Sequence, residues 1–314
     1  MGKMSLGVQL SPRAVDWPSL HAAAERVDEL GYDHLWLPDH LLAGTDDASQ
    51  SVFESYAILA AFAATTTRAR LGLLVGANTF RNPAVVAKTI VTIDHISGGR
   101  AILGLGGGWQ AREHAAYGLE FGRSAGDRLD WLDEALSIIR PLLTGEEVTH
   151  GGPHYRTDHL RLEPRPLQDR LPIMVGGSGE RKTLRTVARY ADMWSAQIGL
   201  DQASHKIEVL RAHCVVVGRD LAEIELTLDC AVVIRDRERD ARAALERMFE
   251  VNGDEPPAAT NSFYWTGTPE QIAERMGAFG DLGFRSFTCT FSAPYDDESL
   301  VRLIEDVKPL VESR

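Results

Sequence analysis

The chain has 314 residues, of which 44% are hydrophobic and 25% are charged, and its formal net charge is −12. These values are typical of a soluble globular protein with one large domain or two ordinary ones, and the acidic balance argues against a general surface for nucleic acid or anionic membranes. Three cysteines lie far apart without a CxxC pair, and neither a secretion signal nor an apolar run of membrane-spanning length is evident, so we expect a reduced, cytoplasmic protein.

Short β-rich apolar runs alternate along the chain with longer amphipathic runs. The first pair shows the pattern, because SLGVQL indicates a strand and the next segment repeats Leu20, Ala24 and Val27 at helical spacing before Gly31. In chain order, strands are predicted over 5–10, 34–38, 69–77, 101–106, 171–177, 191–197, 224–234 and 284–292. Helices are predicted over 17–31, 53–66, 83–99, 126–143, 180–190, 240–250, 269–283 and 296–311.

This alternation predicts an α/β fold, a single (β/α)₈ TIM barrel that spans residues 1–314. Two stretches break the rhythm and are predicted to be irregular insertions, near 144–170 and near 250–266. The alternative is an open doubly wound sheet, which would carry a glycine-rich fingerprint after its first strand. SLGVQLSPR has no such fingerprint, so the barrel is the better prediction.

In a barrel of this kind, the active site lies where the strands end and the following loops begin. Asp39 and His40 end the second predicted strand. A carboxylate beside an imidazole can hold a proton donor or acceptor near neutral pH, so both are candidate catalytic residues. The alternative is that Asp39 caps the next segment and His40 lies at the surface. The histidines of the first insertion belong to no metal-binding motif, so we predict no metal site.

The loop after the fifth predicted strand reads VGGSGER and indicates an anion site. Its glycines free backbone N–H groups to point inward, a serine adds a hydroxyl, and a helix N-terminus follows. The alternative is an ordinary turn before a basic helix face. The candidate anion-binding residues are Gly176, Gly177, Ser178 and Gly179.

The fourth predicted strand ends in GLGGGW. Gly106, Gly107 and Gly108 would let a flat ring lie against the backbone, with Trp109 at its edge. The alternative is a crowded barrel rim where only glycine fits and Trp109 packs on the next helix. No nucleophile elbow, pair of catalytic glutamates or triad accompanies these loops. The pattern therefore favours a bound cofactor that supplies the chemistry.

Three segments resemble the luciferase-like family of flavin and deazaflavin oxidoreductases. They are LWLPDH, TFRNPAVVAKTIVTIDHISGGRAILGLGGGWQAREHAAYGLEF and RPLQDRLPIMVGGSGERKTLRTVARYADMW. The resemblance covers nearly the whole chain, is weakest over 200–265, and is closer to the branch that uses coenzyme F-420, a deazaflavin, than to the branch that uses FMN. It implies a TIM barrel with the cofactor at the carboxyl ends of the strands.

The resemblance also assigns roles to individual residues. Asp39 and His40 match the family's Asp-His pair, whose histidine lies close to the deazaflavin in the F-420-dependent sugar-phosphate dehydrogenases and is proposed there to transfer a proton. Leu74 and Val75 match the site of a non-prolyl cis peptide, which forms a bulge against the centre of the ring. Both pairs are therefore expected at the cofactor.

Gly107, Gly108 and Trp109 match the family's loop after the fourth strand, where the sugar-phosphate dehydrogenases carry a glutamate as catalytic acid at the position of Trp109. An indole cannot replace that acid. The departure argues against the dehydrogenase role and favours a reductase or monooxygenase-like role on an apolar substrate, with the proton supplied by His40 or by solvent.

The resemblance implies an F-420-dependent enzyme that transfers a hydride between the deazaflavin and a small organic substrate. An alternative is a two-component monooxygenase that takes reduced FMN from a partner reductase and reacts with oxygen. A third hypothesis is that the protein is a non-catalytic, flavin-binding relative of these enzymes. A cofactor-reducing dehydrogenase or reductase is an expected partner, and family members are often homodimers. The apolar helix predicted over 53–66 could serve a dimer, but we expect it to cover the barrel.

Overall fold

The computed structural model describes residues 4–43, 50–254 and 262–313. Its barrel strands are β1 (Ser5–Leu10), β2 (His34–Leu37), β3 (Arg70–Leu73), β5 (Ala101–Gly106), β8 (Ile173–Gly176), β9 (Met193–Ala196), β10 (Glu225–Ile234) and β12 (Ser286–Phe291). These strands pair in parallel in the order β1-β2-β3-β5-β8-β9, and β10 closes the ring by pairing with β9 and β12. The predicted TIM barrel is confirmed, and the open sheet is ruled out.

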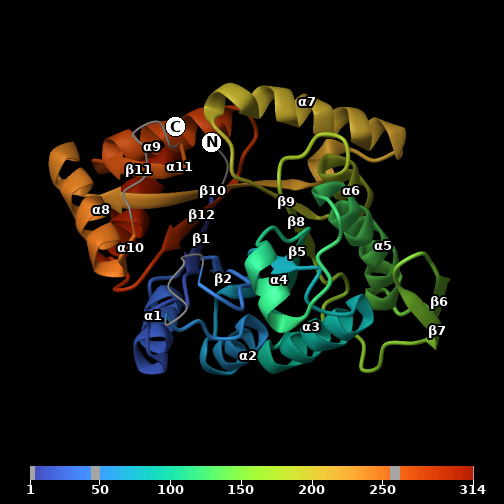
Figure 1. Cartoon of the computed structure of the whole chain (residues 1–314). Coiled ribbons are helices and arrows are strands. Elements are labelled where there is room, and N and C mark those ends of the chain that lie inside the picture. Colours follow the sequence, from blue (N-terminus) through green and yellow to red (C-terminus); the bar gives the residue numbers. More distant parts are fainter. Residues whose placement is uncertain (1–3, 44–49, 255–261, 314) are drawn as a thin grey trace.

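Helices surround the barrel (Figure 1). In chain order, these are α1 (Trp17–Glu29), α2 (Ser55–Thr65), α3 (Pro83–Ser97), α5 (Ala125–Leu143), α6 (Thr183–Tyr190), α7 (Leu200–Val216), α8 (Glu238–Asn252), α9 (Pro269–Asp281), α10 (Asp297–Arg302), the π-helical turn η2 (Leu303–Val307) and α11 (Lys308–Glu312). Local chemistry sets their ends: the Asn82 side chain accepts the Ala84 N–H at the start of α3, and Gly98 ends that helix at φ 69°.

The main apolar core lies between the sheet and this ring of helices. Helix α2 contributes Ile58, Leu59 and Phe62 to it, so this helix covers the barrel as expected. A second cluster of buried residues packs around Trp36. It needs the glycine of the neighbouring strand, because a Cβ on Gly72 would lie 2.5 Å from the Trp36 ring. Among the described residues, no helix is long and apolar enough to cross a membrane.

Four segments differ from the sequence prediction. The insertion near 144–170 contains an antiparallel hairpin, β6 (Val148–Gly151) with β7 (Arg156–Leu160). In the second insertion, β11 (Tyr264–Gly267) extends the sheet beside β10, whereas residues 255–261 lie outside the described part. Helices α4 (Ala111–Tyr117) and α7 were not predicted. The seven residues of α4 are too few to show an apolar period, whereas Ala203, Ile207 and Leu210 in α7 do carry one.

Strands β3 and β5 approach each other unusually closely at Gly104. A Cβ built on this residue would lie 1.8 Å from the Leu73 carbonyl oxygen, which no rotation of a side chain can relieve because the oxygen belongs to the backbone. Glycine is therefore required here by close approach of two backbones. The contact places the end of β3, at Leu73, directly against Gly104 of β5.

We expect Gly104→Ala to lower the free energy of unfolding by about 3 kcal/mol or more, because the added methyl group must push the two strands apart. Urea unfolding followed by tryptophan fluorescence measures this loss. Gly151→Ala is the matched control, since a Cβ on Gly151 meets no heavy atom within 4 Å. Equal stability of the two variants would contradict the close contact.

Candidate active site

A cavity of about 480 Å³ opens at the carboxyl ends of the barrel strands. This volume is within the range of small-molecule sites and is large enough for a tricyclic ring. The cavity brings together nearly all of the residues that the sequence analysis proposed, namely Asp39, His40, Leu74, Val75, Gly106, Gly107, Gly108, Trp109, Gly176, Gly177 and Ser178. Gly179 follows in the chain without lining the cavity, and its carbonyl accepts the Leu184 N–H.

The imidazole of His40 is held by Glu113, a residue of α4 that the sequence analysis did not propose. The Nδ1 atom of His40 lies 3.2 Å from Oε1 of Glu113, and the other carboxylate oxygen accepts the backbone N–H groups of Leu41 (2.9 Å) and Leu42 (3.3 Å). Burial raises the pKa of Glu113, but the bonds from His40 and these two amides outweigh it and leave the pKa lowered.

Glu113 is therefore an ionised carboxylate, which can only accept hydrogen bonds. It follows that Nδ1 of His40 carries a proton and donates it to Glu113. The other ring nitrogen, Nε2, is then free to accept or donate a proton in the cavity. Glu113 thus sets the tautomer of His40 and fixes its ring.

Asp39 does not pair with His40, although the two are adjacent in the chain. Its buried carboxylate accepts bonds from Arg81 at 2.7 and 3.1 Å and from the Ala77 N–H at 2.9 Å. Burial raises the pKa of Asp39, and Arg81 opposes that rise; the two-point contact favours the charged pair. Asp39 thereby ties the end of β2 to β4 (Gly76–Ala77), the short strand that continues β3. Its geometry is that of a positioning residue, and direct contact with a cofactor stays a prediction.

The Leu74–Val75 peptide is cis, as the family resemblance implied, and it separates β3 from β4. The Val75 side chain occupies space that glycines leave open on the two neighbouring strands. A Cβ on Gly106 would lie 2.6 Å from Val75 Cγ2, and one on Gly176 would lie 2.9 Å from either methyl group of Val75. Gln9 donates a hydrogen bond to the Leu74 carbonyl and steadies the bulge from β1.

The glycines of GLGGGW are therefore needed first of all for packing within the barrel rim. Gly106 makes room for Val75, a Cβ on Gly107 would lie 3.1 Å from Leu129, and Gly108 has φ 71° with a Cβ position 2.7 Å from the Thr79 hydroxyl. This agrees with the crowded-rim alternative. All three also line the cavity, so contact with a flat ring stays a prediction.

Trp109 stands at the edge of the cavity with 69% of its surface exposed. Its ring meets the His40 ring edge to face, with centroids 5.6 Å apart and an interplanar angle of 81°. The indole therefore lies beside the imidazole and is largely exposed. It supplies an apolar surface beside the group that can exchange a proton.

The glycine loop after β8 has part of its backbone already engaged. Gly177 has φ 115°, and its N–H donates to the Ser195 carbonyl at 3.0 Å. The ammonium group of Lys182 bonds Asp130 at 2.6 Å and the Gly126 carbonyl. The Gly177 amide is thus not free to bind an anion, whereas Ser178 lines the cavity. An anion site here stays a prediction, centred on Ser178.

Two further cavity residues, Ser195 on β9 and Asp229 on β10, were also missed by sequence reasoning. The Ser195 hydroxyl donates to one carboxyl oxygen of Asp229. Burial raises the pKa of Asp229 to about 7, and the Ser195 hydrogen bond only partly opposes this. The alternation of Glu225, Thr227 and Asp229 in β10 places all three on one face of a strand, and this was the signal that could have found Asp229.

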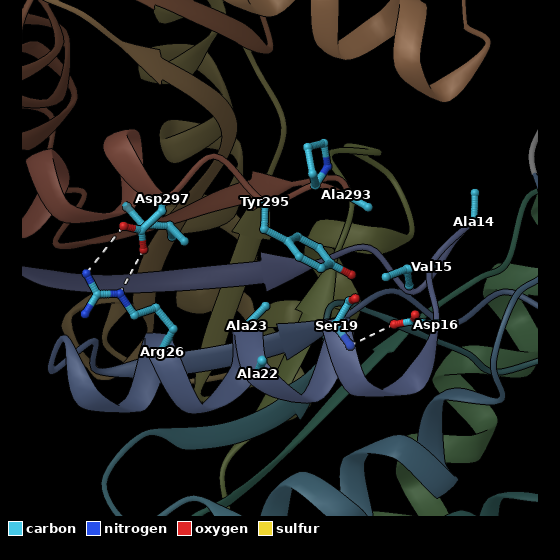
Figure 2. A pocket seen from close by; sticks show the side chains of 12 residues that line it. Ala14, Val15, Asp16, Ser19, Ala22, Ala23, Arg26, Ala293, Tyr295 and Asp297 are labelled. Atoms are coloured by element: carbon cyan, nitrogen blue, oxygen red, sulfur yellow. Dashed lines mark hydrogen bonds and ion pairs between the residues drawn. The ribbon is translucent and has the colours of Figure 1, made fainter.

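A second hollow, of about 490 Å³, lies between α1 and the loop after β12 (Figure 2). Its charged groups already have partners: Asp16 accepts the Ser19 N–H and Arg26 pairs with Asp297 (Figure 2). The charged groups of this hollow are therefore less available to bind or react with a ligand than those of the cavity at His40. In the described part of the chain, no group of three or more His, Cys, Asp or Glu residues could hold a metal ion.

Comparison with known proteins shows what the chain resembles. A family model described as luciferase-like monooxygenase matches residues 4–286. The F-420-dependent glucose-6-phosphate dehydrogenase of Nakamurella multipartita is 30% identical over 299 residues, which cover 88% of this chain and 86% of that protein.

Two solved structures have the same fold. An F-420-dependent secondary alcohol dehydrogenase, in complex with an F-420–acetone adduct, has a TM-score of 0.82 at 20% identity and covers 98% of this chain and 99% of its own. EDTA monooxygenase from Chelativorans sp. BNC1 has a TM-score of 0.82 at 16% identity, covering 99% of this chain and 94% of its own. Since both scores are equal, the fold alone does not distinguish a dehydrogenase from a monooxygenase.

Two of the three carboxyl groups that line the cavity, Glu113 and Asp229, should change stability in opposite directions as pH rises. Glu113 has a lowered pKa in the folded state, so the stability it contributes is present at neutral pH and is lost in acid. Asp229 has a raised pKa, so the folded state loses stability as pH rises from about 4 towards 7. A rise from 3.8 to about 7 corresponds to at most about 4 kcal/mol, which access through the cavity reduces.

We therefore expect Asp229→Asn to be more stable than the wild type at pH 8 by about 2 kcal/mol, with the difference shrinking towards pH 5. Glu113→Gln should be less stable at pH 7, with its deficit shrinking in acid. Urea unfolding between pH 4 and pH 8 measures both. Parallel stability curves for the wild type and the Asp229 variant would contradict the raised pKa.

Proposed function

This chain belongs to the luciferase-like monooxygenase family, and from that premise we propose that it is an oxidoreductase that binds coenzyme F-420 and transfers a hydride to or from a small organic substrate. One observation carries the proposal: a single cavity joins the Leu74–Val75 bulge, the imidazole of His40 and the glycine loop at Ser178. A flat apolar wall, a proton-exchanging group and a polar loop are what a bound deazaflavin needs. The 30% identity to an F-420-dependent dehydrogenase supports this cofactor over FMN.

The residues present fit such a cofactor. Val75, packed into the gap left by Gly106 and Gly176, presents a rigid wall against which the ring would lie. Ser178 and the neighbouring backbone would hold the phosphate of the tail, at the end of the cavity next to α6. When bound, the deazaflavin supplies the hydride chemistry, which no side chain of this cavity could supply.

His40 handles the proton that accompanies the hydride. Because Glu113 fixes the Nδ1–H tautomer, Nε2 accepts a proton in one direction of the reaction and its conjugate acid donates it in the other. Trp109 shields one edge of the imidazole from water and, in place of a carboxylic acid, gives the substrate an apolar neighbour.

A two-component monooxygenase that uses reduced FMN is the alternative, and the equal likeness to EDTA monooxygenase keeps it in view. It differs in two ways that can be measured, which are the cofactor bound and the need for oxygen. With F-420, a separate dehydrogenase or reductase would regenerate the cofactor. A non-catalytic flavin-binding role would not require the imidazole of His40 to be oriented by Glu113.

We expect the purified protein to bind F-420 with a micromolar dissociation constant and FMN at least tenfold more weakly. Titration with each cofactor, followed by the change in ring fluorescence, measures both constants. Tight FMN binding without F-420 binding would contradict the proposed cofactor. Tight binding of both without turnover of any alcohol, aldehyde or ketone would favour the non-catalytic alternative.

We expect His40→Ala to lower kcat by about a hundredfold to ten-thousandfold, because it removes the proton-exchanging group. Glu113→Gln should lower kcat by about tenfold, because an amide can donate as well as accept at Nδ1 and no longer fixes the Nδ1–H tautomer of His40. Trp109→Phe is the control and should keep kcat within a few-fold, since neither ring transfers a proton. Stopped-flow absorbance of the deazaflavin measures all three, and an intact rate in His40→Ala would remove His40 from the mechanism.

A further inference from the structure

Ser195 and Asp229 form a polar pair in the wall of the cavity that the proposed mechanism does not use. Ser195 lies on β9, which is four strands from β2 in either direction around the barrel, so the pair faces the β2 end from the opposite wall. His40 follows β2. A substrate in the cavity would thus have one proton-exchanging group on each side.

The Asp229 carboxyl has an unused hydrogen-bonding atom. Oδ2 accepts the Ser195 hydroxyl, whereas Oδ1 is shielded from solvent and has no hydrogen-bond partner among the described residues. The neighbouring residues on the adjoining strands bring no charge: Thr288 is the register partner on β12, and Ser195 comes from β9. Burial without a cation raises the pKa of Asp229 to about 7. A buried oxygen that makes no hydrogen bond lowers the stability of the fold, and a ligand that bonds to it removes this penalty.

The charges around the cavity limit what that ligand can be. The titratable residues that line the cavity are Asp39, His40, Glu113 and Asp229, and none of the described lining residues is a lysine or an arginine. Residues 44–49 (GTDDAS) and 255–261 (EPPAATN), which the structure does not describe, also contain no lysine or arginine. The Glu113 and Asp229 carboxyls would repel a negatively charged substrate placed beside them. A wall with carboxyl groups and no cation favours an uncharged substrate.

We infer that Asp229 and Ser195 form the substrate-oxygen subsite, and that the substrate is an uncharged alcohol or the corresponding carbonyl compound. This inference rests on the proposed hydride-transfer function and adds the substrate class and a second catalytic residue. Asp229 would reach the substrate oxygen through Oδ1 after a small rotation of its carboxyl, because Oδ1 is shielded from solvent in this structure, while Ser195 orients the carboxyl by its bond to Oδ2.

The step balances without a further reactant. In the oxidative direction the ionised carboxylate of Asp229 would take the O–H proton at Oδ1 as the C=O bond forms, and the bound deazaflavin would supply the hydride acceptor. In the reverse direction the protonated carboxyl returns the proton to the carbonyl oxygen as the hydride arrives. Since the carboxyl takes and gives the proton at the substrate oxygen, His40 remains available to exchange a proton with the reduced ring.

Asp229→Asn tests the residue, since it keeps the shape of the carboxyl and cannot exchange a proton. Infrared spectra of the cofactor-free protein should show a carboxylic acid band in the wild type that titrates near pH 7 and is absent from the variant. With F-420 bound, the variant should bind cyclohexanone about tenfold more weakly and lose the pH dependence of that binding. Thr288→Val, which alters a neighbouring hydroxyl that does not line the cavity, is the control and should leave binding unchanged.

Matched probes test the substrate class. Cyclohexanol and other uncharged secondary alcohols should bind and be oxidised, whereas cyclohexyl phosphate should not compete with them. Overturning results would be phosphate-ester binding tighter than alcohol binding, no binding by any uncharged alcohol or ketone, or unchanged probe binding in Asp229→Asn. The infrared band and the F-420 titration are separate measurements, so loss of F-420 binding alone would contradict the proposed function and not the Asp229 subsite.

Discussion

The side chain of Val75 lies so close to Gly106 and Gly176 that a Cβ on either residue would clash with it, and the geometry of the site depends on that contact. It allows the chain after β3 to press into the barrel wall and forms one side of the cavity. Asp39 then ties the end of β2 to the residues beyond the bulge through Arg81 and the Ala77 amide. The adjacent residue in the chain, His40, is held at the cavity as a consequence. The glycines and the buried ion pair therefore determine geometry, and the chemistry is left to other groups.

Those other groups are two carboxyls in opposite environments. Glu113 accepts three hydrogen bonds and is ionised, so it fixes the Nδ1–H tautomer of His40. Asp229 has a single hydroxyl partner and little solvent, so it holds its own proton up to about neutral pH. Environments that push two pKa values apart commonly separate the roles of acid and base within one site. In this site, Asp229 would serve as the acid, in place of the glutamate that the sugar-phosphate dehydrogenases carry at the position of Trp109.

The fold and the location of the site followed from the sequence, because period-2 and period-3.6 patterns identify strands and helices and a barrel places its chemistry at the strand ends. The cis peptide at Leu74–Val75 followed from family resemblance and was confirmed. The partner of His40 did not follow, because Glu113 lies 73 positions away on a helix too short to show a period. The adjacency of Asp39 and His40 in the chain suggested a pair, but their side chains bind different partners. The sequence alone does not tell whether the glycines of GLGGGW clear space for a flat ring or for the packing of the barrel rim, because both explanations require glycine.

The central claim is that the chain moves a hydride between a deazaflavin and an uncharged substrate without oxygen. The most direct test is a single turnover of the F-420-bound enzyme with an alcohol labelled by deuterium at the carbinol carbon, carried out with and without oxygen. We predict that deuterium appears on the deazaflavin in equal amount to the ketone formed, at the same rate in both atmospheres. Turnover that requires oxygen, or deuterium found only in water, would contradict the account.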